Sequence, residues 1–286
     1  MVRQAPVAMD AAVRRTAAGT PYLREPGVVL LAKPATDVAG LVPFLSGLSD
    51  EFAGYVSDPT PLPAGTLLCK VAGQICYESF GPKRTKNRGA DRYFANIMEQ
   101  GHGSVLEHAN YTVLLYGVSR SLTHELVRHR HLCFSQVSQR YVSVARFVER
   151  SEFQADPDLH AAFEARIDTA ARQYAELTEA LRARRAADGG GFATMAPRDQ
   201  RKAVQQAARA LLPNETEAPI VVTGNVRAWR HVIAMRTGPH AESEIRRCMH
   251  RVWQVLAAEE PVLFGDYAEQ PLPDGTTALS TPHPKV

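Results

Sequence analysis

The segment from Arg120 to Tyr141 constrains the fold more than any other part of the chain. It reads RSLTHELVRHRHLCFSQVSQRY, with four arginines, three histidines and Glu125 as its only acid. Cations this close repel one another unless they lie in water or share a negative partner, and arginine forks bind phosphate or carboxylate through paired hydrogen bonds. Apolar residues alternate with the charges, which argues against a fully solvated surface. The segment therefore predicts a site for an anion.

The residues that follow the histidines suggest how large this anion is. Ser135, Gln136, Ser138 and Gln139 offer hydroxyl and amide groups, and Arg140 adds another fork. Such a set can hydrogen-bond a phosphate, a ribose and a base edge, so a nucleotide-sized anion fits it best. The alternative is a nucleic-acid-binding module that docks the same basic segment on DNA or RNA phosphates, which would give a steep salt dependence. The net charge of +3 is too small for a general nucleic-acid coat protein.

A buried strand is expected just before the basic segment. Residues 109–118 carry the β-rich run YTVLLY, and Ser119 then has the side chain of a helix N-cap. We expect a helix from Arg120 to about His131, and a loop or broken helix over FSQVSQRY. A strand-to-helix junction here would fix the direction in which Arg128 and Arg130 leave the scaffold.

The rest of the chain predicts an α+β fold with helix in excess. We expect several packed helices, a small mixed sheet and no Rossmann glycine fingerprint. Pro157 follows Asp156 at the start of a long amphipathic pattern, which is a typical helix start. The expected strands cover 28–31, 109–118 and 220–222, and the expected helices cover 67–80, 91–100, 120–131, 157–181, 198–212, 226–236 and 241–258.

Three parts are predicted along the chain. Residues 1–27 are expected to be a flexible extension, residues 28–270 a single catalytic domain, and residues 271–286 a loose tail rich in proline and threonine. The stretch from Gly81 to Gly89 looks like an exposed basic loop. The four cysteines contain no CxxC pair, and no apolar run is long enough to span a membrane. A reduced, cytoplasmic protein is expected, without a membrane partner.

The RHR triplet and four further blocks, in the order that they have in the family, resemble the flavin-dependent thymidylate synthases. Arg128-His129-Arg130 is separated by seven residues from Ser138, which is similar to that family's signature. The upstream block GHGSVLEH begins at Gly101, and the downstream blocks QQAARALLP, TGNVRAWR and AMRTGPHAESEI follow at Gln205, Thr223 and Ala234. The resemblance spans roughly residues 69–264. One RHR triplet is weak evidence, but four ordered blocks are specific.

The resemblance implies an activity and its cofactors. The family converts dUMP to dTMP, with 5,10-methylenetetrahydrofolate as carbon donor, FAD as hydride carrier and NADPH as the reductant of the flavin. It works as a homotetramer whose active sites draw on more than one chain. Such shared sites would explain why the matched residues are scattered along the sequence without a dinucleotide-binding fingerprint.

The resemblance also assigns site residues by matched position. The residues expected to contact FAD are His102, Ser104, Arg128, His129, Arg130, Gln136, Asn225, Arg227 and His231. Those expected to contact dUMP are Glu125, Arg128, Gln136, Ser138, Arg140, Arg209 and Arg236. Catalysis is expected from Arg236, whose cation would stabilise charge at the O2/N3 edge of uracil, and from Ser138. Ser138 could donate a hydrogen bond to a phosphate or act as a nucleophile, and the residues alone leave both roles open.

A metal site is the least favoured hypothesis. His124-Glu125 begins an HExxH-like pattern, but Arg128 occupies the second ligand position and the next histidine is His129. We therefore expect no metal.

Overall fold

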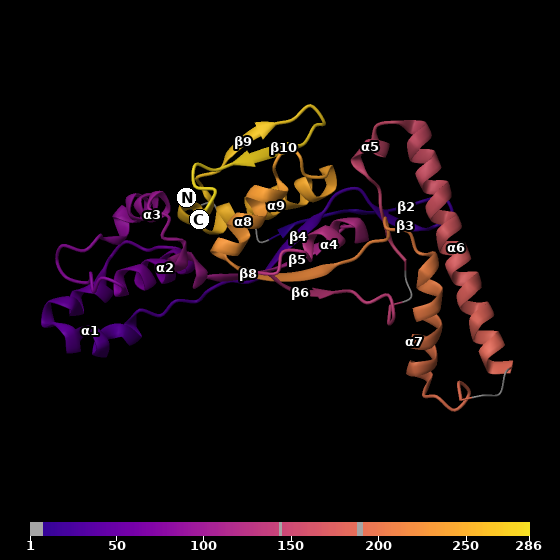
Figure 1. The fold of residues 1–286 in the computed structure, drawn as a ribbon, viewed down its shortest axis with the longest axis horizontal. Helices are drawn as coiled ribbons and strands as arrows, with labels where there is room; N and C mark the ends of the chain where they lie inside the picture. The colour runs from indigo at the N-terminus through magenta and orange to yellow at the C-terminus, as the bar shows by residue number, and fades with distance from the viewer. Residues whose placement is uncertain (1–7, 143–144, 188–190) are drawn as a thin grey trace.

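The computed structural model describes residues 8–142, 145–187 and 191–286. The molecule is elongated: helices α1–α3 lie at one end, a sheet with its covering helices forms the centre, and a helical arm of α6 and α7 projects at the other end (Figure 1). Helices and small sheets alternate along the chain, which confirms the expected α+β class with helix in excess. Among the described residues no helix is both long and apolar enough to span a membrane.

The central sheet has five antiparallel strands in the order β1-β4-β5-β8-β6. Alternate residues of β5 and β8 are buried, and Val113 pairs with Val222 in the register that joins them. Side chains of successive strand residues point to opposite faces, so this alternation marks one face as the core face. The strands are β1 (Ala8–Met9), β4 (Gly27–Ala32), β5 (Asn110–Tyr116), β6 (Cys133–Gln136) and β8 (Ile220–Asn225).

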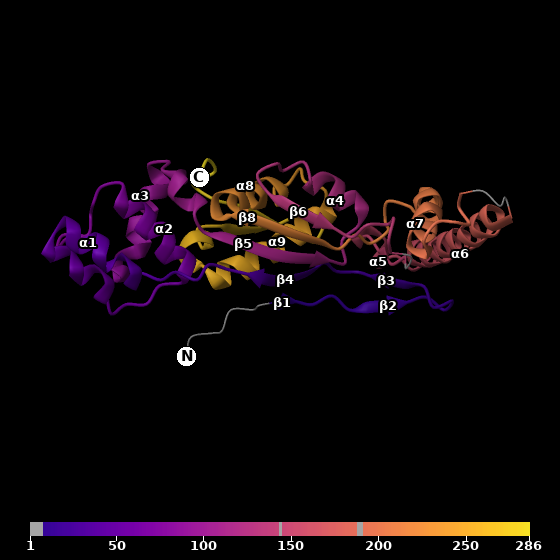
Figure 2. The same cartoon turned by 90° about the horizontal axis from the view of Figure 1, so that it is seen from below.

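Three helices cover that face and close the main core. Buried residues of β5 and β8 pack with Leu122, Trp229 and Met249, one from each helix. Figure 2 shows the opposite face, with no helix drawn over β4, β5 and β8. The covering helices are α4 (Arg120–Leu126), α8 (Val226–Arg236) and α9 (Ser243–Glu259).

The α1–α3 end has a smaller core of its own. Leu45, Tyr55, Val71 and Phe80 form it, and the Glu260 carboxylate binds the first amides of α2. The helices are α1 (Val42–Leu48), α2 (Ala64–Ile75) and α3 (Ala90–Glu99), with 3-10 turns at Ala39–Leu41, Asp50–Ser57, Asn87–Gly89 and Gly103–Glu107.

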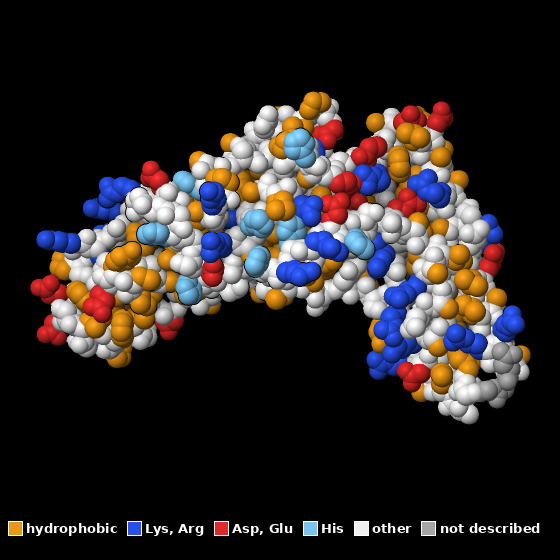
Figure 3. Space-filling model, viewed as in Figure 1, with side chains coloured by type: hydrophobic (Ala, Val, Ile, Leu, Met, Phe, Trp, Pro, Cys, Tyr) orange, Lys and Arg blue, Asp and Glu red, His pale blue; other side chains and the backbone are white. Residues whose placement is uncertain are grey.

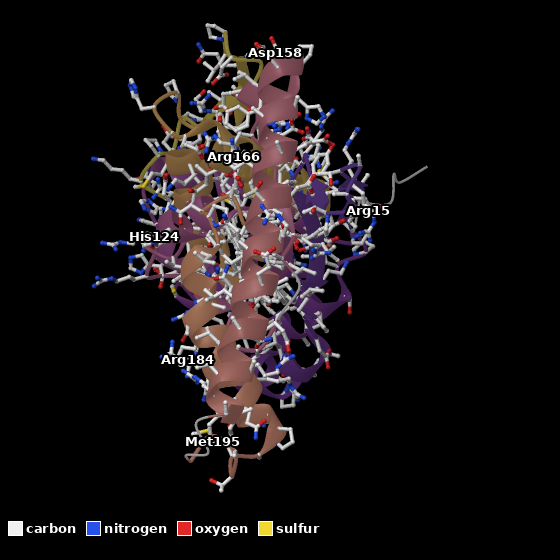
Figure 4. All side chains as sticks on the ribbon, turned by 90° about the vertical axis from the view of Figure 1, so that its right-hand side faces the viewer. Arg15, His124, Asp158, Arg166, Arg184 and Met195 are labelled. Atoms are coloured by element: carbon white, nitrogen blue, oxygen red, sulfur yellow. The ribbon has the colours of Figure 1, made fainter. Side chains whose placement is uncertain are left out.

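The arm is a helix pair on a second small sheet. Asp158 lies near one end of α6, Arg184 near the other and Met195 at the tip, with α7 alongside (Figure 4). Tyr22, Phe163 and Ile167 form the arm's core. Its elements are β2 (Val13–Arg15), β3 (Pro21–Leu23), β7 (Phe147–Val148), α5 (Ser151–Gln154), α6 (Pro157–Ala187), α7 (Pro197–Ala208) and a 3-10 turn at Arg209–Leu211.

The last part of the chain is a short helix followed by a β-hairpin that packs on α8 and α9. The helix is α10 (Pro261–Phe264), and the strands of the hairpin are β9 (Ala268–Pro271) and β10 (Thr277–Ser280). Leu279 and Val286 are buried in the main core, so residues 272–286 differ from the loose tail expected. The extension expected to be flexible likewise contributes β1, β2 and β3, although residues 1–7 lie outside the described part.

Five local expectations were wrong. The helix after Ser119 ends at Leu126, and β6 replaces the loop expected after Leu132 because its backbone pairs with β8. Helix α2 begins before Leu67 and ends at Ile75. Asp91 lies inside α3 and does not cap it. In the basic loop Arg84 is buried, because it forms an ion pair of 2.8 Å with the buried carboxylate of Asp58.

Candidate active site

Arg236 lies at the centre of the candidate site. Helix α4 follows β5 and α8 follows β8, and these strands are antiparallel neighbours, so the helices start at opposite ends of the sheet. The Arg236 Nη1 donates to the Glu125 carboxylate at 2.7 Å, and its Nε donates to His129 Nε2 at 2.8 Å. The Nη2 also donates to the Glu125 carbonyl at 3.3 Å. One guanidinium therefore joins two segments that are far apart in sequence.

His129 is neutral in this arrangement. Its Nε2 accepts a hydrogen bond from Arg236, which a protonated ring nitrogen cannot do. Burial, the Arg236 charge and the neighbouring His231 and His131 together lower the pKa of His129 to about 4. The ring of His231 meets that of His129 edge to face, with centroids 6.0 Å apart. The pair forms a rigid polar surface beside Arg236.

Beside these histidines lies a cavity of about 470 Å³. Asn225, Arg227 and His231 line it, which brings together three of the residues expected to contact FAD. Asn225 also caps α8, since its Oδ1 accepts from the Ala228 amide at 2.8 Å. A residue in this position holds the start of the helix, so it fixes where Arg227 points.

His102 and Ser104 line a second cavity of about 390 Å³. Arg227 borders both cavities, so they are neighbours. The Arg227 Nη1 donates to the Glu107 carboxylate at 2.6 Å, an acid that the resemblance left without a role. Gly103 allows this approach, because a Cβ atom there would lie 2.9 Å from Arg227 Nε. A side chain at this position would require the Arg227 side chain to shift.

The residues between α4 and β6 have two different environments. Arg128, Arg130 and His131 are exposed, whereas His129 is buried. Gln136 lies at the end of β6, and its amide donates to the Thr123 hydroxyl at 3.1 Å. The early end of α4 therefore leaves the two arginines of the RHR triplet directed to solvent, from a turn and not from a helix.

Ser138, Arg140 and Arg209 belong to two segments that border another cavity, near the arm. Ser138 Oγ accepts from the Arg140 amide, and Arg209 lies exposed in the turn after α7. Their neighbours Gln139 and Leu212 share a cavity of about 270 Å³. No hydrogen bond or cavity among the described residues links this group to Arg236. One chain therefore divides the expected dUMP contacts between two places.

The sequence analysis missed a cationic cluster next to this group. Arg140, Arg198 and Lys202 lie 5.9, 5.8 and 5.5 Å from the centre of the Tyr141 ring. A hydrogen bond with Lys202 lowers the pKa of the Tyr141 phenol. In Figure 3 basic side chains gather along the side of the arm, over α7, that faces the centre of the molecule. The sequence carried no signal for it, because the two segments are joined only by the fold.

The donor set fits an anionic, nucleotide-derived cofactor. Arg227, His231, His131 and Asn225 line the larger cavity, and Glu107 is its only acid. Guanidinium, imidazole and amide donors suit phosphate and ribose groups. The fold and the site together define a nucleotide-binding α+β protein.

Comparison with known proteins narrows this class. The family model described as thymidylate synthase complementing protein matches residues 60–262. A flavin-dependent thymidylate synthase of Mycobacterium sp. (strain JLS) is 43% identical over 227 residues, covering 78% of this chain and 88% of that protein. Those of Mycolicibacterium gilvum (strain PYR-GCK) and Mycobacterium tuberculosis (strain ATCC 25177 / H37Ra) are also 43% identical, with the same coverage. This chain belongs to the flavin-dependent thymidylate synthase family.

Proposed function

We propose that this protein methylates dUMP to dTMP with FAD as its flavin, NADPH as reductant and 5,10-methylenetetrahydrofolate as carbon donor. The observation that carries the proposal is the meeting of Arg236, Glu125 and His129 beside the cavity lined by Asn225, Arg227 and His231. The names of the relatives support a flavin-dependent thymidylate synthase. The nucleic-acid-binding alternative gains no support from them.

In this proposal Arg236 activates the uracil ring. Its cation stabilises negative charge at the O2/N3 edge while electron density builds at C5. Glu125 and His129 hold the fork in one direction, and the buried, neutral His129 adds no competing charge. A fork that is already oriented loses little freedom when the substrate binds. When bound, FAD supplies hydride chemistry that no side chain can.

The remaining matched residues are proposed to bind the cofactor and the substrate. FAD contacts are assigned to His102, Ser104, Arg128, His129, Arg130, Gln136, Asn225, Arg227 and His231. Contacts with dUMP are assigned to Glu125, Arg128, Gln136, Ser138, Arg140, Arg209 and Arg236. The two adjoining cavities that share Arg227 support the first assignment, and the cluster of unlike donors at Ser138 and Arg140 supports the second.

We also propose that the protein works as a homotetramer with shared active sites. The face of the central sheet opposite the helices carries a row of half-buried apolar residues, Val29, Leu114 and Val221, paired across three strands. A second copy that covers this face could supply Ser138 and Arg209 to the site at Arg236. Fully active monomers in a sizing experiment would contradict this. The four cysteines are free thiols, in keeping with the cytoplasmic location we propose.

Ser138 is proposed to bind phosphate or ribose and not to attack the substrate. Its Oγ is hydrogen-bonded to the Arg140 amide, and no histidine or carboxylate among the described residues accepts its proton. Ser138→Ala should lose one hydrogen bond to a charged group, about 10- to 150-fold in kcat/KM, and keep measurable turnover. Complete inactivity with intact dUMP and FAD binding would instead identify a nucleophile.

One experiment tests the function itself. The purified protein should show the visible absorption of oxidised flavin, retain it on desalting, and form dTMP from dUMP only when NADPH and methylenetetrahydrofolate are both present. Omitting either one is the matched control. A colourless protein that binds nucleic acid with a steep salt dependence would overturn the proposal.

A further inference from the structure

The cavity beside Arg227 has one wall that lies outside the region of the family match. Pro284, Lys285 and Val286 line it together with residues of α8, whereas the match ends at residue 262. This wall is formed after the β9–β10 hairpin, where the chain turns back toward α8 (Figure 1). It therefore belongs to the cavity through the fold and not through the shared sequence blocks.

Arg230 fixes the position of this wall. The side chain is buried, and its Nε donates to the Val286 carbonyl at 3.2 Å while its Nη1 and Nη2 bind the Asp266 carboxylate at 2.6 and 2.8 Å. The Thr281 hydroxyl donates to the same carboxylate at 2.5 Å. The segment from Thr281 to Val286 is therefore hydrogen-bonded at both ends to the Arg230–Asp266 pair. These bonds hold the residues between them against α8.

Lys285 lies in this ordered segment and is exposed at the cavity. It adds a second charged basic side chain to that of Arg227 on another wall, and it has no ion-pair partner among the described residues. Glu107, the one acid of the cavity, is already paired with Arg227. Arg227 and Lys285 therefore face one cavity whose acidic side chain is already paired, and this arrangement favours an anionic ligand.

We propose that Lys285 binds the diphosphate group of a dinucleotide cofactor in this cavity. Two dinucleotides could supply that group, FAD and NADPH, and both carry the same diphosphate chemistry. The inference rests on the function proposed above, because it takes the cavity to be part of the cofactor site. It adds a residue outside the family's sequence blocks to that site.

The test compares Lys285→Gln with Lys33→Gln as a matched loss of one exposed lysine. Lys33 pairs with Glu259 and lines none of the cavities described above. The flavin is removed from each protein, and FAD binding is followed by the quenching of flavin fluorescence. NADPH binding is titrated separately on the flavin-loaded proteins. Lys285→Gln should lower the affinity for one of the two dinucleotides by about 3- to 10-fold. This loss lies between that of an exposed ion pair and that of a charge-assisted hydrogen bond.

Charge and salt distinguish a contact from a structural effect. Lys285→Arg should restore the affinity, and the difference between Lys285→Gln and the native protein should shrink at about 1 M salt, where exposed charges are screened. Weaker binding of FAD assigns Lys285 to the flavin site. Weaker binding of NADPH alone assigns it to the site of the reductant. Equal binding of both dinucleotides by Lys285→Gln and Lys33→Gln overturns the inference and leaves the function intact. Native protein that binds neither dinucleotide overturns both.

Discussion

The two sides of helix α8 present the same residue type in opposite states. On the inner side Arg230 is buried, and it donates to the Asp266 carboxylate, the Leu263 and Val286 carbonyls and the Thr281 hydroxyl. On the outer side Arg236 keeps a fifth of its side-chain surface exposed and is held by Glu125 and His129. The inner arginine has its hydrogen-bonding groups satisfied within the fold, whereas the outer one remains partly exposed to solvent.

The difference shows how one helix can serve stability and chemistry at once. Burial raises the pKa of Asp266, but the hydrogen bonds and charge of Arg230 outweigh burial and lower it, so the pair remains charged inside the protein. A buried pair of this kind is strongly destabilising to break. Arg236 has a half-exposed carboxylate as its partner, and such a pair contributes little to stability. In the proposed function the Arg236–Glu125 pair serves to orient the guanidinium.

The largest expected effect comes from removing Arg230 on the inner side of α8. Arg230→Met should lower the free energy of unfolding by about 3–5 kcal/mol, because it leaves the largely buried Asp266 carboxylate without its cationic partner. Urea unfolding followed by circular dichroism measures it. The double variant Arg230→Met/Asp266→Asn is the control and should recover part of the loss. A single variant within about 1 kcal/mol of the native protein would mean that this pair behaves like a surface pair.

On the outer side the expected effect is on rate. Arg236→Lys keeps the charge but loses the paired hydrogen bonds, so kcat at saturating dUMP should fall by about 10²- to 10³-fold while unfolding changes little. NADPH oxidation measured without folate is the control and should survive, because it requires no uracil activation. A raised KM with normal kcat would make Arg236 a ground-state anchor and would refute its proposed role.

His129, a partner of Arg236, makes the stability of the protein depend on pH. Its pKa in the folded protein is about 4, below the 6.5 expected when unfolded, so the unfolded chain takes up the proton first as pH falls. Stability from neutral His129 is therefore complete above about pH 6.5 and is lost on the way to pH 4, by up to ~3 kcal/mol. His129→Gln keeps an acceptor for Arg236 without titrating and should flatten this part of the profile. An acid limb of the same size in His129→Gln and in the native protein would contradict this assignment.

The smallest effect concerns the start of α8. Asn225→Ala removes the cap on the Ala228 amide and should cost about 1 kcal/mol of stability, whereas Asn225→Asp keeps the cap. Urea unfolding and FAD titration are measured on both. If Asn225 also contacts the cofactor, FAD affinity should fall in Asn225→Asp while stability does not. Equal FAD binding by Asn225→Asp and the native protein would limit Asn225 to the cap.

The sequence by itself determined many of the local elements and predicted a set of site residues. The β-rich run YTVLLY predicted β5, Ser119 was correctly predicted as the cap of α4, and the pattern from Val226 to Arg236 predicted α8 with the observed ends. These features follow from periodicity and capping, which act over a few residues. The ordered blocks also identified the family, because they record which side chains the chemistry requires.

Only the tertiary structure decided which of those residues meet. The pairing of Cys133–Gln136 with β8 made a strand where the local pattern suggested a loop, and the Asp58 ion pair buried Arg84. Neither partner lies near in sequence, so no local pattern could reveal it. The same holds for the contacts of Arg236 with Glu125 and for the wall at Lys285. Long-range hydrogen bonds and ion pairs form only once the sheet has set the register of the elements. Local elements can therefore be predicted from the sequence, whereas these contacts are known only from the tertiary structure.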